Sequence, residues 1–104
     1  MTSGMMMNYW IRQISNWGTD KGILPNPDPM AQWLKTLEEV EELRDAIKDN
    51  NRDEVMDAIG DIFVTLVMQT HAWEVSMDAC VQKAYEEIAG RTGKMVDGQF
   101  VKDK

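Results

Sequence analysis

The chain has 104 residues, of which 43% are hydrophobic and 28% charged, and its formal net charge is −7. This length, without a second block of different composition, predicts one small domain over residues 1–104. The acidic balance argues against non-specific binding to nucleic acid or to an anionic membrane, so neither is expected as a partner.

The Met-rich start of the chain lacks the basic segment and the long apolar run of a signal peptide. We expect residues 1–5 to be a disordered lead into the first helix. No later stretch approaches the ~20 apolar residues that a membrane-spanning helix needs. The single cysteine, Cys80, excludes an intrachain disulfide, so these features together predict a cytoplasmic protein.

Apolar residues recur at steps of three and four from about residue 6 to residue 17, which predicts a first amphipathic helix. Gly18 is expected to end it. Residues 18–29 contain two glycines and three prolines, which is typical of a loop. At the end of this loop, Asp28 followed by Pro29 favours the start of a second helix.

The second helix is expected from about residue 29 to residue 48. Its apolar residues recur with a helical period and define one expected core face: Trp33, Leu37, Val40, Leu43 and Ile47. A polar turn at residues 50–53 follows, in which either Asn51 or Asp53 can cap the next helix.

The third helix is expected from Glu54 to about Glu74. Apart from its acids it is apolar on nearly every side, which predicts a central position with an outer side that meets another subunit. Four tryptophans and nine methionines exceed what one small bundle can cover, so we expect a homo-oligomer, either a dimer or a tetramer. Gly60 in this helix indicates a close approach, either of the neighbouring helix or of a ligand.

Ser76 or Asp78 can cap a fourth helix that runs to about Ala89. Its apolar residues are expected to face inward: Met77, Cys80, Val81, Ala84, Tyr85 and Ile88. In the tail, residues 91–104, an Asp-Gly pair between short apolar runs indicates a tight hairpin turn or a folded-back segment. These elements predict an all-α fold, a four-helix bundle with a short C-terminal tail or hairpin.

The acids of the second and third helices carry the clearest chemical signal. Glu54, Asp57 and Asp61 fall within roughly 60° of arc at about 100° per residue, and their row continues into the apolar Val64 and Met68. Carboxylates that enter a core are costly unless they are paired or bind a metal. The neighbouring cations are too few to neutralise the acids, and a hard divalent cation between two antiparallel helices would satisfy them.

Residues 38–42 (EEVEE) and 57–61 (DAIGD) resemble the paired acidic motif of the MazG-like nucleotide pyrophosphohydrolases, EExxE on one helix and ExxD on the next. The resemblance extends from Trp17 through the RTGKMVDGQFVK segment and covers most of the chain. It implies the all-α NTP pyrophosphatase type of fold. It also implies Mg²⁺-dependent (or Mn²⁺-dependent) hydrolysis of a (d)NTP to a (d)NMP and pyrophosphate.

The resemblance further implies roles for single residues. Glu39, Glu42 and Asp61 match the metal-binding positions of the motif. Glu38 matches its first Glu and is the candidate base that orients the attacking water. Lys35, about one turn before the motif, is placed to reach a phosphate.

The chain departs from the family pattern at two positions. Ala58 stands where the family commonly has Glu, and Asp57, on the same helix face, can substitute for it. In a second register, Glu54 and Asp57 are the metal-binding pair and Asp61 is an addition. Glu86 replaces an Asn found in many relatives, which leaves recognition of the base and the sugar open.

Lys83, Arg91 and Lys94 follow the acidic helices and have two interpretations. They are either a solubilising end of the chain, or contacts to the substrate phosphates or to the acids of a partner subunit. Two other functions also stay open. One is a non-catalytic helical interaction module whose acids bind a basic partner, and the other is a metal-binding regulatory protein without turnover.

Overall fold

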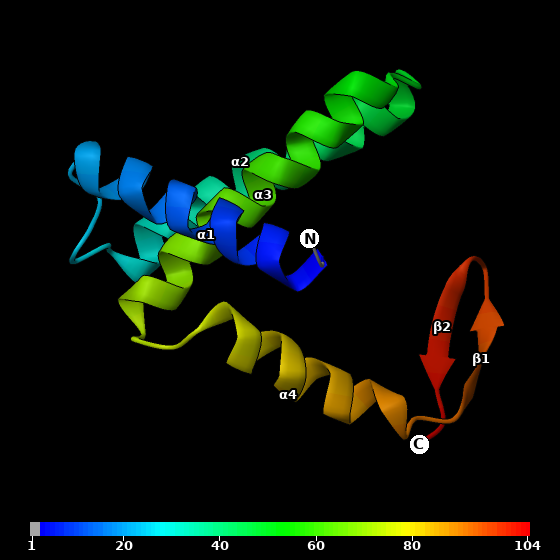
Figure 1. Ribbon diagram of the computed structural model, residues 1–104. Coiled ribbons are helices and arrows are strands. Elements are labelled where there is room, and N and C mark those ends of the chain that lie inside the picture. Colours follow the sequence, from blue (N-terminus) through cyan, green and yellow to red (C-terminus); the bar gives the residue numbers. More distant parts are fainter. Residues whose placement is uncertain (1–2) are drawn as a thin grey trace.

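The computed structural model describes residues 3–104. Its elements are, in chain order, α1 (Ser3–Asp20), α2 (Pro29–Lys48), α3 (Arg52–Ala72), α4 (Met77–Ala89), β1 (Gly93–Val96) and β2 (Gln99–Lys102). Helices α2 and α3 lie antiparallel along each other and α1 packs on α3, whereas α4 and the two strands extend away from these three helices (Figure 1). The expected all-α fold with four helices is confirmed. No helix among the described residues combines the length and the hydropathy of a membrane span.

The helix starts follow the local signals of the sequence. Asp28, Asn51 and Ser76 are the N-caps of α2, α3 and α4, and each side chain accepts hydrogen bonds from backbone N–H groups two or three residues further on. Where the sequence left a second choice, Asp53 or Asp78, the structure uses the earlier residue.

The first helix is longer than expected, because Gly18 lies inside it instead of ending it. Gly18 is buried, and a Cβ built on it would lie 2.9 Å from the sulfur of Met68 and 3.2 Å from Leu24. The missing side chain therefore allows α1 to pack closely on α3. Of the lead expected at residues 1–5, residues 1–2 lie outside the described part and the others belong to α1.

The core is small. Leu24, Val67 and Met68 are its buried centre, and five partly buried residues pack against them: Ile11, Ile14, Ile23, Phe63 and Met77. Where α2 meets α3, the side chains are small or polar. The Thr36 hydroxyl donates a hydrogen bond to the Thr65 hydroxyl at 2.8 Å across this contact.

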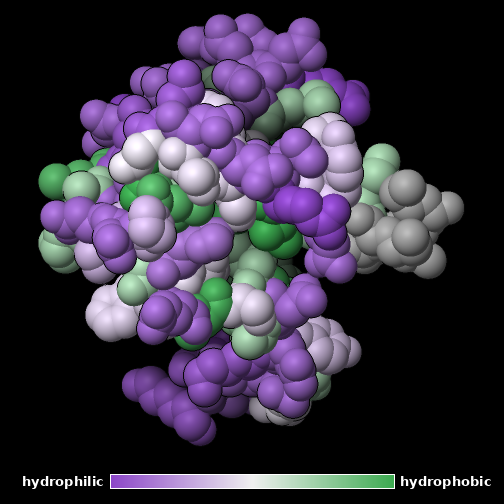
Figure 2. Space-filling view, turned by 60° about the vertical axis from the view of Figure 1, so that its left-hand side comes forward, coloured by the Kyte–Doolittle hydropathy of each residue, from purple (hydrophilic) through white to green (hydrophobic). Residues whose placement is uncertain are grey.

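The expected core face of α2 is wrong for all its residues except the half-buried Leu43. Trp33, Leu37, Val40 and Ile47 are each at least 40% exposed. The least exposed residues of α2 form a stripe one position earlier, and they are Gln32, Thr36, Glu39, Leu43 and Ala46. Small side chains let α2 and α3 approach closely, so the helix turns its large apolar residues outward. Figure 2 shows hydrophobic residues at the surface, among hydrophilic ones.

The inward face expected for α4 is also corrected. Met77 packs against the core, but Val81, Tyr85 and Ile88 are each more than half exposed, and Cys80 is exposed as well. The reason is the direction of α4, which leaves the other helices after its first turn (Figure 1).

Two smaller expectations concern the C-terminal hairpin and Gly60. The tight hairpin is confirmed, because β1 pairs antiparallel with β2 around Asp97 and Gly98, whose φ angles of 50° and 81° suit a two-residue turn. No helix within residues 3–104 approaches Gly60 closely, since a Cβ built there would meet none of their atoms within 4 Å, and the approach of a ligand stays a prediction.

Candidate metal centre

Three carboxylates from two helices meet in one place. Glu39 and Glu42 lie one turn apart on α2, and Asp61 faces them from α3; one oxygen of each lies within 4.8 Å of the others. The antiparallel pairing of α2 and α3 positions these side chains, and it groups the residues that match the metal-binding positions of the motif. Three carboxylate oxygens at such separations are a ligand set suited to a hard divalent cation.

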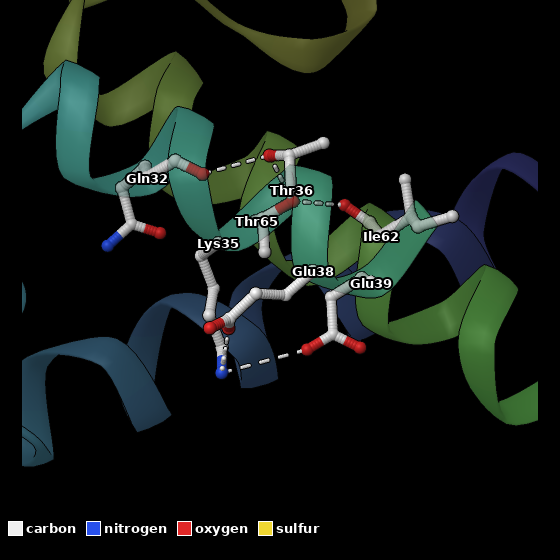
Figure 3. A network of polar contacts seen from close by, with 7 residues as sticks. All are labelled: Gln32, Lys35, Thr36, Glu38, Glu39, Ile62 and Thr65. Carbon is white, nitrogen blue, oxygen red and sulfur yellow. Dashed lines mark hydrogen bonds and ion pairs between the residues drawn. The ribbon is translucent and has the colours of Figure 1, made fainter. Parts of the chain in front are cut away.

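Glu39 is the member of this group that lies deepest. It is only 7% exposed, although it is ionisable. Its Oε1 atom lies 3.8 Å from the Lys35 Nζ atom, whereas its Oε2 atom is buried and has no hydrogen-bond donor within the described part of the chain (Figure 3). A buried carboxylate oxygen without a partner is costly, so this atom indicates a ligand, and a cation fits it.

The electrostatics of the group also favour a cation. The nearby Glu42 carboxylate, with which Glu39 could share a hydrogen bond only when protonated, raises the pKa of Glu39 to about 7 together with burial and the charges of Glu42 and Asp61. Burial, followed by the charges of Asp57 and Glu42, raises the pKa of Asp61. Lys35 opposes both shifts without cancelling them. A bound divalent cation would favour the ionised forms and reverse these shifts.

Lys35 and Glu38 stand at the rim of this group. The Lys35 Nζ atom lies 3.0 Å from Glu38 Oε2, and this contact raises the pKa of Lys35 (Figure 3). The Glu38 side chain is 65% exposed, so it is free to contact solvent and lies outside the group of three acids. Lys35 therefore links the exposed candidate base to the buried Glu39.

Glu54 and Asp57 lie in a second acidic hollow of about 340 Å³, next to the first. Glu42 belongs both to the group of three acids and to the lining of the second hollow, which also includes Asp45. Asp61 is thus the acid of α3 that lies in one group with Glu39 and Glu42. Sequence reasoning missed Asp45, although its spacing of three residues from Glu42 continues the acidic row along α2.

A pocket of about 410 Å³ opens directly beside Glu39 and Asp61. Its other walls come from α1, the following loop, α2 and α3, and they include Trp17, Gln32 and Met68. The pocket thus combines an aromatic ring, an amide and apolar side chains with the acids. No pattern in the sequence singled out Trp17 or Gln32 for this place, because only the packing of α1 on α3 brings them together.

The remaining predicted cations are not brought to the acids. Lys83 lies on α4, Arg91 follows this helix, and Lys94 belongs to β1. Arg91 forms a 3.9 Å ion pair with Glu87 in the last turn of α4. Within residues 3–104, Lys35 is the predicted phosphate contact that lies at the site.

Comparison with known proteins gives a family. Residues 28–96 match the MazG nucleotide pyrophosphohydrolase domain, and this range contains α2, α3 and all the acids described above. Over 58 residues the chain is 34% identical to an uncharacterized 18.2 kDa protein of the rep-hol intergenic region of Haemophilus phage HP1 (strain HP1c1). That similarity covers 56% of this chain and 36% of the phage protein. No solved structure gives a significant match. Because the family match spans more than half of its length, the chain belongs to the MazG nucleotide pyrophosphohydrolase domain family.

Proposed function

We propose that the chain is a Mg²⁺-dependent nucleoside triphosphate pyrophosphohydrolase, for which Mn²⁺ is an alternative metal. It converts a (d)NTP to a (d)NMP and pyrophosphate. The observation that carries this proposal is the buried, unpaired Oε2 atom of Glu39 in a group of three carboxylates. Family membership supports the reaction class, and the adjacent pocket supports a nucleotide as the substrate.

The residues fit a hard metal ion. Glu39, Glu42 and Asp61 would hold it through carboxylate oxygens, the ligands that Mg²⁺ prefers, and water can complete its shell on the exposed side of Glu42. When bound, Mg²⁺ offsets the charge of the triphosphate and lowers the pKa of an attacking water.

Lys35 and Glu38 form a contact that the substrate can separate. The Lys35 ammonium lies beside the acids, where it can bind a phosphate oxygen in place of Glu38. Glu38 then has a free carboxylate that can orient a water and accept its proton. General base catalysis of this kind contributes typically about 10²- to 10⁴-fold to a rate.

The pocket beside Glu39 and Asp61 is the proposed place of the nucleoside. Its volume of about 410 Å³ lies in the range typical of small-molecule sites. Trp17 offers a ring on which a base can stack, and the Gln32 amide offers a donor and an acceptor for a base edge. The triphosphate would then extend toward the acids on the same side of α2.

We also infer a homo-oligomer, a dimer or a tetramer, as the working form. Large apolar residues of α2 and α3 are at least 40% exposed, and these are Met30, Trp33, Leu34, Leu37, Val40, Ile47, Met56, Ile59 and Leu66. Contact with another subunit would remove these apolar side chains from water. Sedimentation that shows only an 11.9 kDa species at micromolar concentration would contradict this inference.

The proposed reaction is tested by measuring product release from a panel of ribo- and deoxyribonucleoside triphosphates, with and without Mg²⁺. We expect pyrophosphate and nucleoside monophosphate in equal amounts, and none after chelation of the metal. Mg²⁺ binding without turnover would favour a metal-binding regulatory protein. If Mg²⁺ neither binds nor stabilises the chain, a non-catalytic interaction module becomes the better interpretation.

A further inference from the structure

The C-terminal segment of residues 77–104, here called the arm, has an apolar side that nothing in the described chain covers. Val81, Tyr85 and Ile88 recur at steps of four and three on α4 and are 59%, 64% and 54% exposed. Phe100 of the hairpin is 52% exposed. A one-sided apolar helix gains its stability by burying that side against another element, so the arm lacks its packing partner.

The connection to α3 holds the arm away from its own acidic helices. Only four residues separate α3 from α4. The backbone N–H of Val75 donates to the Thr70 carbonyl at 3.0 Å, and the Trp73 indole N–H donates to the Gln69 side chain at 3.1 Å. Ser76 then fixes the start of α4 as its N-cap. A connection that is so short and so extensively hydrogen-bonded sets the direction of α4 (Figure 1). This argues against the arm folding back onto α2 and α3 of its own chain.

The hairpin end of the arm and the acidic helices carry opposite net charge, whereas the arm as a whole (residues 77–104) has five cations and five acids and is neutral. Residues 91–104 carry four cations and two acids, a net charge of +2. Residues 29–72, which comprise α2, the turn and α3, carry ten acids and four cations, a net charge of −6. The outer face of α2 and α3 is also apolar and exposed, as is that of α4. A second copy of the chain therefore offers an apolar surface to α4 and opposite charge to residues 91–104.

We propose that the arm docks on a second copy of this chain and places Lys94 of its hairpin at the acidic group of that copy. In a twofold dimer each arm packs on the other chain, so the apolar sides of both α4 helices are buried by the same symmetric contact. Lys94 forms no ion pair within residues 3–104, whereas Arg91 is held by Glu87. A role of Lys94 in binding the triphosphate rests on the proposed function, whereas docking of the arm does not.

Docking is tested without any assay of activity. A mixture of ¹⁴N and ¹⁵N full-length chains is treated with a carbodiimide, which joins a lysine to a carboxylate in contact with it. We expect peptides that join Lys94 of one isotope to an acid of residues 38–61 of the other. Lys94 cross-links confined to one isotope, or a chain that stays monomeric, would overturn the proposal.

A pair of variants on α4 provides a matched control. Tyr85→Asp puts a charge on the apolar side and should weaken self-association by at least about tenfold. Ala79→Asp puts the same charge on the opposite side of the helix and should leave the association unchanged. Circular dichroism shows whether each variant keeps its helices. Equal association of the two variants would contradict docking through the apolar side of α4.

Mixing of two defective chains tests the role of Lys94. Asp61→Asn lacks a proposed ligand but keeps its arm, and Lys94→Gln keeps its acids. If Lys94 acts on the other copy, the mixture regains up to about a quarter of the parent activity, because half of the dimers are mixed and each has one complete site. If Lys94 acts within its own chain, mixing restores nothing. A parent without turnover would remove the substrate role and the proposed function, and the cross-linking result would still decide docking.

Discussion

The three packed helices and the arm differ in which side chains they bury. Between α2 and α3 the chain buries Glu39 and Thr65, while Tyr85 and Ile88 of α4 stay exposed. Burial follows from which element lies opposite, and hydropathy alone does not decide it. A buried carboxylate oxygen without a hydrogen-bond donor, such as Glu39 Oε2, indicates a ligand, and an exposed apolar helix face indicates a protein surface. The two regions thus point to two different kinds of partner.

The largest expected effect concerns the proposed ligands of the packed helices. Glu39→Gln, Glu42→Gln and Asp61→Asn should each lower the rate of pyrophosphate release by about 10²- to 10³-fold, the size typical of one lost electrostatic contact to a transition state. Glu41→Gln is the matched control on the same helix and should be nearly silent. Equal and small effects at Glu41 and Glu42 would mean that the acids are only a solvated face.

Thermal unfolding separates this loss from misfolding. Without metal, the three variants should be at least as stable as the parent, because repulsion among clustered acids is relieved. Mg²⁺ should stabilise the parent by about 2.7 kcal/mol when its free concentration is about 100 times its Kd, and the variants much less. Unchanged stabilisation of all three variants would contradict the proposed ligands.

A glycine pair compares the packing of the two regions directly. Gly18→Ala puts a Cβ 2.9 Å from the flexible end of the buried Met68 side chain, which must shift. The helix preference of Ala offsets part of this cost, so the free energy of unfolding should fall by up to about 2 kcal/mol. Gly90→Ala, at the end of α4, meets no atom within 4 Å and should change it little. Denaturant titration measures both changes. Similar losses at the two positions would remove the distinction between packed helices and free arm.

The pH dependence of stability should come from the packed helices. The pKa of Glu39 is raised from 4.5 to about 7, so the metal-free folded state binds a proton that the unfolded state releases. The contribution of this proton to the free energy of unfolding is therefore fully present below about pH 4.5 and is lost as the pH rises through about 7. Glu39→Gln should flatten this dependence in thermal unfolding from pH 5 to pH 8. A parent whose stability rises across this range would contradict it.

The smallest effect is expected in the second acidic hollow. Asp57→Asn should lower activity moderately, because the negative charge of Asp57 near Asp61 adds to the attraction of the site for a cation. Glu54→Gln, one turn further away, should change the rate only a few-fold. A loss at Glu54 as large as that at Asp61 would instead support the register in which Glu54 and Asp57 bind the metal.

The sequence by itself determined the features that act over a few residues. Asp28, Asn51 and Ser76 start their helices because a side-chain oxygen meets a backbone N–H two or three positions away. Asp97 and Gly98 form the hairpin turn because they tolerate positive φ. Helical spacing alone did not predict which carboxylates meet. The resemblance to the family motif singled out Glu39, Glu42 and Asp61, which lie together in the structure, and it left Glu54 with Asp57 as a second register.

Only the tertiary structure decided which helix faces are covered. The apolar period of α2 predicted a core face through Trp33 and Val40, but the close contact of small residues with α3 rotated the buried stripe by one position. Gly18 stays helical because Met68 lies against it, and Trp17 lines the pocket because α1 packs on α3. Each of these outcomes depends on residues far apart in the chain. A helical period of apolar residues predicts that one face of the helix is buried, but the shape of the opposing helix determines which face this is.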